Sequence, residues 1–281
     1  MTDNALFESP DVRGLRLVQA ALRVSVSLAC WGAVATVFHQ QSAPLTCTLK
    51  NVYNLAPDSC QKIENICACV LIVCGLVTLS RPLWPALLLI GIWFTAASSV
   101  RFYEDGSSLP ALVPIEHAVR FLTPWALILV DFFPPRLKFG LARFLAAMVM
   151  LRLGIVASLL GTGLRAILDS RSSQGMTAVV AVVGEKLCHQ PLSAETAAIA
   201  TAVTGGISIG IALAMSSGRP RGIAVLAAMW SLFTAFGWTI AHGGQGYQET
   251  LLRSAEWGAP LALLMFWIRG IEDRPGRMLA E

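Results

Sequence analysis

Residues 144–165 read FLAAMVMLRLGIVASLLGTGLR, and only Arg152 and Arg165 interrupt this run with a charge. A bilayer core is crossed by a helix of roughly 20 mostly apolar residues, at about 1.5 Å per residue. The run therefore has the length and composition of one membrane-spanning helix.

The rest of the chain has the same character. Of its 281 residues, 55% are hydrophobic and 14% are charged, and the mean hydropathy is +0.64. Soluble domains usually carry about 25% charged residues. The sequence therefore predicts an all-α, polytopic membrane protein with eight transmembrane helices. The expected spans are residues 17–38, 63–80, 83–101, 111–131, 144–165, 195–215, 222–241 and 249–268.

The basic residues predict how the spans are oriented. With the N-terminus inside, eleven Lys and Arg fall in the short cytoplasmic segments and six fall in the longer outer ones. Positive charge near span ends favours the cytoplasmic side. We expect a multi-pass protein of the bacterial inner membrane with both termini in the cytoplasm. The net charge of +4 then reflects topology, and no nucleic-acid partner is expected.

Four sequence anchors recur in the same order in the two halves of the chain, which predicts an internal duplication. Because each copy has an even number of spans, the copies should be parallel and related by a pseudo-twofold axis along the membrane normal. The expected units are two four-helix bundles, residues 1–135 and 136–281. The matched positions are Leu22, Arg23 and Gly32 with Leu151, Arg152 and Gly161; Arg81 and Pro82 with Arg219 and Pro220; Trp93 and Gly106 with Trp230 and Gly243; and Glu116 and Arg120 with Glu249 and Arg253.

Each unit has an arginine early in its first helix, inside LRVSVSLACWG (22–32) and LRLGIVASLLG (151–161). With this L-R-x(8)-G pattern, its hydropathy and its length, each unit resembles the DoxX-like family of small membrane proteins. The resemblance covers most of each half, although this chain differs in having two fused units. It implies a subunit that works with quinone or quinol in a membrane redox system, with no covalently bound cofactor. Membrane lipids and other membrane subunits are the expected partners, and the catalytic residues stay unknown.

Charged residues also lead into the fourth and eighth expected spans. Glu116 and Arg120 lie four positions apart on one helix face, as do Glu249 and Arg253. We expect each pair to form along its own helix and to face the bundle interior, with arginine donors left for carbonyl or phosphate oxygens. The alternative is an interfacial ion pair that only caps its helix. The candidate residues for a quinone or lipid headgroup are Arg101, Glu116, His117, Arg120, His242, Glu249, Arg253 and Glu256.

Arg23 and Arg152 lie about seven or eight residues inside their spans, where a charge costs about 2–3 kcal/mol unless it reaches a partner or the surface. Two interpretations remain open at this point. Each arginine either extends to inner-leaflet phosphates or forms a buried polar contact that fixes the bundle.

The cysteines predict one disulfide and no metal site. Cys47 and Cys60 lie in an outer loop, where an oxidising compartment would join them. Cys188, in the corresponding loop of the second half, is left without a predicted partner, and no metal-binding signature occurs.

Three classes of function fit the sequence. The first is a quinone-linked redox subunit, and the second is a non-catalytic structural subunit of a larger membrane complex. The third, a small-molecule carrier, is disfavoured by the parallel repeat. Whether the chain is an enzyme is left open by the residues alone.

Overall fold

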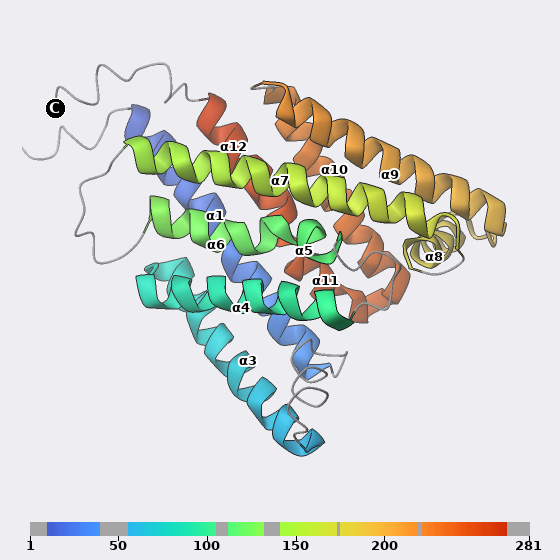
Figure 1. Cartoon of the computed structure of the whole chain (residues 1–281), viewed down its shortest axis with the longest axis horizontal. Helices are drawn as coiled ribbons and strands as arrows, with labels where there is room; N and C mark the ends of the chain where they lie inside the picture. The colour runs from blue at the N-terminus through green and yellow to red at the C-terminus, as the bar shows by residue number, and fades with distance from the viewer. Residues whose placement is uncertain are drawn as a thin grey trace, which may run out of the picture.

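The computed structural model describes residues 10–39, 56–104, 112–131, 141–172, 175–218 and 221–268. These residues form helices, and no strand occurs among them (Figure 1). The all-α prediction is confirmed for this part of the chain.

The helices follow the expected spans closely. The first half contains α1 (Pro10–Phe38), α3 (Pro57–Ser80), α4 (Trp84–Glu104), α5 (Leu112–Glu116) and α6 (Ala118–Val130). The second half contains α7 (Leu141–Asp169), α8 (Met176–Cys188), α9 (Ala194–Ser216), α10 (Arg221–His242), the 3-10 turn η2 (Gly243–Gly246), α11 (Tyr247–Leu252) and α12 (Ser254–Ile268).

Five of these helices are long and apolar enough to cross a membrane: Gly14–Phe38, Asp58–Ser80, Ala142–Asp169, Ala194–Ser216 and Arg221–His242. Two shorter apolar helices, Trp84–Val100 and Ala118–Val130, accompany them. Large apolar side chains such as Met229 and Phe233, each 64% exposed, cover the outer faces. A helix that is hydrophobic all round is typical of a membrane span, and the chain is a multi-pass membrane protein.

The fourth and eighth expected spans are not continuous helices. α5 and α6 are separated at His117, and α11 and α12 are separated at Arg253. At each break the carbonyl oxygen accepts a bond from the amide three residues later: Arg120 N donates to His117 O at 3.0 Å, and Glu256 N donates to Arg253 O at 2.9 Å. A tightened turn of this kind redirects the chain while keeping its backbone hydrogen-bonded.

The helices pack in a pattern that crosses between the two halves. α1 packs against α3 and against α11 and α12, while α7 packs against α9 and against α5 and α6. α4 lies on α6, α10 lies on α12, and α6 touches α12. α1 begins and α12 ends at the same end of the bundle (Figure 1).

Two glycines bring the crossing helices together. A Cβ on Gly32 of α1 would overlap the backbone nitrogen of Leu252, and a Cβ on Gly161 of α7 would lie 2.6 Å from the backbone nitrogen of Glu116. Each glycine therefore packs against the last residue of a short helix, just before a break. This close contact fixes the depth at which each break lies in the bundle.

Candidate functional site

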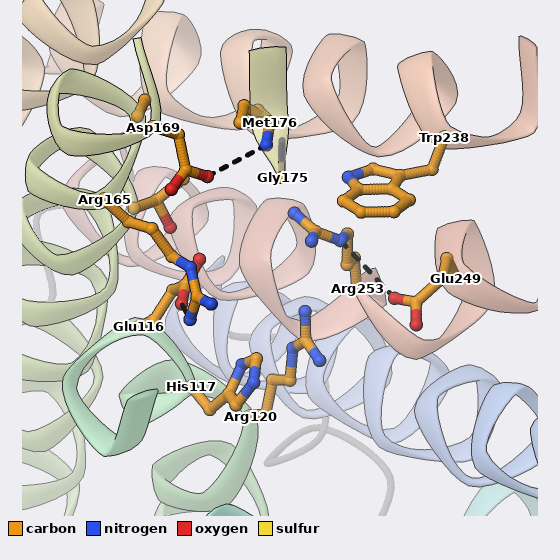
Figure 2. Close-up of a pocket in the computed structure, with 12 residues that line it drawn as sticks. Glu116, His117, Arg120, Arg165, Asp169, Gly175, Met176, Trp238, Glu249 and Arg253 are labelled. Atoms are coloured by element: carbon orange, nitrogen blue, oxygen red, sulfur yellow. Dashed lines mark hydrogen bonds and ion pairs between the residues drawn. The ribbon is translucent and has the colours of Figure 1, made fainter. Parts of the chain in front are cut away.

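The two breaks lie beside a cavity of about 220 Å³ at the end of the bundle formed by the last turns of α7 and α10. In Figure 2 the labelled side chains around it come from α5, α6, α7, α10 and α11 and from the start of α8. The cavity is lined by Glu116, His117, Arg120, Thr162, Arg165, Ala166, Asp169, Gly175, Met176, Trp238, Glu249 and Arg253.

Arg120 and Glu256 join the two halves at the base of this cavity. Arg120 Nε and Nη2 donate to Glu256 Oε1 at 2.9 and 2.7 Å, from α6 to α12. Only 4% of Arg120 and 9% of Glu256 is exposed. A buried ion pair of this geometry is strongly destabilised when one partner is removed, because the other charge is left without compensation.

Glu116 is held by the neighbouring helix α7. Arg165 Nη1 donates to Glu116 Oε2 at 3.2 Å, and Ser158 Oγ donates to the Glu116 carbonyl oxygen at 2.5 Å. α7 therefore fixes both the side chain and the backbone of the residue that precedes the first break.

Asp169 fixes the rim of the cavity. Its Oδ2 accepts from Met176 N at 2.9 Å, and its carbonyl oxygen accepts from Thr177 Oγ1 at 2.7 Å. The intervening Gly175 has a φ of +61°, which L side chains rarely adopt. The end of α7 is thus joined to the beginning of α8, as Figure 2 shows.

Arg253 is the arginine with the weakest protein contacts in this cluster. Its Nε lies 3.6 Å from Glu249 Oε2 and its Nη1 lies 3.7 Å from Glu256 Oε2, both longer than an ordinary hydrogen bond. Nε has no hydrogen-bond partner among the described residues, although only 8% of the residue is exposed. The guanidinium lies over the ring of Trp238, 5.1 Å from its centroid.

The lining residues are balanced in charge. Three arginines, Arg120, Arg165 and Arg253, face three carboxylates, Glu116, Asp169 and Glu249. Trp238 adds an indole Nε1 that is buried and has no hydrogen-bond partner among the described residues. A fourth carboxylate, Glu256, lies just outside the lining and binds Arg120. The cavity therefore offers both donors and acceptors without a surplus of positive charge.

The structure brings five of the eight candidate residues together: Glu116, His117, Arg120, Glu249 and Arg253 all line the cavity. Glu256 lies outside the lining and binds Arg120. His242 is exposed and stacks on Trp238 with ring centroids 5.5 Å apart. The side chain of Arg101 lies outside the described residues.

The expectation that Glu116 pairs with Arg120 along one helix is wrong. Each of the two residues is paired with a residue on a different helix, because the break at His117 interrupts the regular spacing between them. Glu249 and Arg253 do lie within ion-pair distance along their own segment.

Sequence reasoning missed Arg165, Asp169 and Trp238 as lining residues. A signal for the first two was available, because Arg165 and Asp169 are four positions apart and so share one face of α7. Trp238 resembled the other tryptophans near span ends, and its contact with Arg253 depends on the fold.

Arg23 and Arg152 both contact protein groups at the opposite end of the bundle. Arg23 Nε donates to Asp131 Oδ2 at 2.5 Å. Arg152 donates to the carbonyl oxygens of Met215, at 2.9 and 2.6 Å, and Ser216, at 3.0 Å, at the end of α9. These contacts favour the interpretation that both arginines fix the bundle.

Cys60 is buried in the first turns of α3, whereas Cys47 lies outside the described residues, so the predicted disulfide between them stays a prediction. In the described part of the chain no group of three or more His, Cys, Asp and Glu side chains is placed to hold a metal ion.

Comparison of the chain with protein-family models, with curated proteins and with solved structures found no match.

Proposed function

We propose that the chain is an integral membrane subunit that binds the headgroup of a quinone or quinol in a membrane redox system. The observation that carries the proposal is the charge-balanced cavity with the buried and weakly bonded Arg253 at its wall. Its volume of about 220 Å³ is far above the roughly 10–15 Å³ that a single water needs, so a ligand of several atoms fits.

Charge balance favours a neutral ligand over an anion. A phosphate or carboxylate would gain from the arginines but would also face Glu116, Asp169 and Glu249. A neutral ring with two oxygens meets no such repulsion. It can take hydrogen bonds from buried donors that are otherwise unused, which is favourable because an unmade buried hydrogen bond is costly.

Both redox forms of a quinone find suitable partners in this lining. The carbonyl oxygens of the oxidised form accept from Arg253 and from the indole nitrogen of Trp238. The hydroxyl groups of the reduced form donate to carboxylates such as Glu249. In this proposal another subunit of the complex carries electrons to or from the bound ring.

We also propose that the eight expected spans form two parallel four-helix units, residues 1–135 and 136–281, each of the DoxX-like kind. The packing between the halves supports this. The first helix of each half packs on two short helices of the other half: α1 on α11 and α12, and α7 on α5 and α6. The equivalent contacts of Gly32 and Gly161 support it as well. A further match is the spacing of the breaks, because His117 and Arg253 each precede a proline, Pro124 or Pro260, by seven residues.

With both termini in the cytoplasm of a bacterial cell, the cavity lies in the outer half of the membrane. Its lining residues come from the ends of α7 and α10 and from the beginnings of the fourth and eighth spans. All of these are outward ends in the proposed topology.

The test is to purify the full chain from its native membrane in a mild detergent and to measure extracted quinone by chromatography and mass spectrometry. We expect close to one quinone per chain, and clearly less for Arg253→Met. Arg171→Met is the matched control, because Arg171 is exposed and lies outside the cavity lining.

Binding of the tailless ubiquinone ring should also persist in excess phosphate or succinate. Displacement of the ring by either anion would contradict a neutral ligand. Tight partner subunits without any quinone would favour the other class, a non-catalytic structural subunit of a larger membrane complex.

A further inference from the structure

A second cavity adjoins the polar one and has a different character. It has a volume of about 40 Å³, lies between α1 and α4, and shares His117 and Arg120 with the polar cavity. Its other walls include Val37, Trp93, Phe94 and Leu252. The two cavities are therefore neighbours on either side of the first helix break.

Two hydroxyl groups in this second cavity donate to carbonyl oxygens of their own helices. Thr36 Oγ1 donates to the Ala33 carbonyl oxygen at 2.6 Å, and Ser98 Oγ donates to the Phe94 carbonyl oxygen at 2.8 Å. Arg120 is neutralised by Glu256. An occupant would meet a mostly apolar surface, which a hydrocarbon group fits better than a polar group does.

The corresponding place between α7 and α10 is nearly filled. There the cavity is about 10 Å³, and it is lined by hydroxyl groups including Ser208, Ser231 and Thr234. Trp230 crosses this region and donates from Nε1 to Ser208 Oγ at 2.9 Å. The apolar space beside the first break therefore has no equal counterpart beside the second.

We infer that the ligand of the polar cavity is amphipathic, and that its hydrocarbon substituent lies between α1 and α4, against Trp93, Phe94 and Leu252. This inference rests on the proposed function and specifies its substrate class, a quinone with an alkyl or prenyl side chain. The headgroup binds on the side of Arg253, and the first carbons of the side chain pass the neutral Arg120–Glu256 pair.

The test uses the full chain in phosphatidylcholine nanodiscs, with quenching of tryptophan fluorescence as the readout. Two probes share one headgroup: the tailless ubiquinone ring and decylubiquinone. Ala97→Leu places a larger side chain in the apolar cavity. Ala96→Leu is the control, because it makes the same change on the same helix outside the cavity lining.

We expect Ala97→Leu to weaken decylubiquinone binding about tenfold relative to binding of the tailless ring, because the larger side chain fills the space of the decyl group. Ala96→Leu should leave the ratio of the two affinities unchanged. The ratio removes the effect of membrane partitioning, since that is the same for every variant.

Two different failures are distinguishable. If the wild-type chain binds the tailless ring and Ala97→Leu leaves the ratio unchanged, the side-chain site is wrong and the proposed function stands. If neither compound binds the wild-type chain, the proposed function is wrong and this inference fails with it.

Discussion

The helix breaks at His117 and Arg253 have closely similar backbones but position their arginines differently. Beside the first break, Arg120 donates two short hydrogen bonds to Glu256. At the second, Arg253 lies 3.6 and 3.7 Å from carboxylate oxygens, has no hydrogen-bond partner for its Nε among the described residues, and lies over an indole ring. Two arginines of similar burial thus differ in how fully the protein uses their donors.

Under the proposed function, this difference separates a structural role for Arg120 from a binding role for Arg253. An arginine whose donors are used by the fold holds two helices together and has little left for a ligand. An arginine that is buried with unused donors is stable only because charge lies near it, and it gains most when a ligand oxygen arrives. Substitutions at the two breaks should therefore change different properties.

The largest loss of stability is expected for Arg120→Met. It leaves Glu256 buried without its hydrogen-bonded partner, and the free energy of unfolding should fall by about 3–5 kcal/mol. The measurement is equilibrium unfolding of the purified chain in mixed micelles. The double variant Arg120→Met with Glu256→Leu should recover most of the loss, and a double variant as unstable as the single one would show that the pair is not the cause.

The next largest losses of stability are expected for Gly161→Ala and Gly32→Ala. Overpacking should lower the free energy of unfolding by about 1–3 kcal/mol in each variant. Either added methyl group would meet backbone atoms of a crossing short helix, so the helices would have to separate. Gly206→Ala is the matched control, because nothing lies within 4 Å of its Cβ position. Equal thermal unfolding midpoints for Gly161→Ala and Gly206→Ala would rule out the close contact.

A smaller effect is expected at the opposite end of the bundle. Arg152→Met removes hydrogen bonds to the last carbonyl oxygens of α9 and should reduce stability by about 1–2 kcal/mol. Arg23→Met should cost about 1 kcal/mol or less, because its side chain is 27% exposed and water screens its pair with Asp131. The same unfolding assay measures both variants. A larger loss of stability for Arg23→Met than for Arg152→Met would contradict this order.

The helices were predictable because apolar length alone determines a membrane span. Every expected span falls on a helix or on a pair of short helices. The break at His117 was not predictable in the same way, since α5 and α6 together read as one apolar run. It lies beside the close contact between Gly161 of α7 and the backbone of Glu116, which the sequence of the fourth span does not reveal.

The ion pairs were harder still, because they form between segments far apart in the chain. Aligning Glu116 and Arg120 with Glu249 and Arg253 matched residue types 133 positions apart, whereas the breaks and the prolines are 136 positions apart. In that second register Arg120 corresponds to Glu256, the residue that it binds. The residue types alone do not favour the offset of 136 positions over that of 133. The pairing of Arg120 with Glu256 becomes evident only from the contact between α6 and α12.

The most direct test of the account is a titration of the tailless ubiquinone ring into the wild-type chain and into Arg253→Met, both in nanodiscs. The account predicts binding that is about 10- to 100-fold weaker for Arg253→Met, the loss of a hydrogen bond to a charged donor. It also predicts a smaller loss of stability than that of Arg120→Met. Equal affinity for the ring in Arg253→Met and wild type would contradict the account.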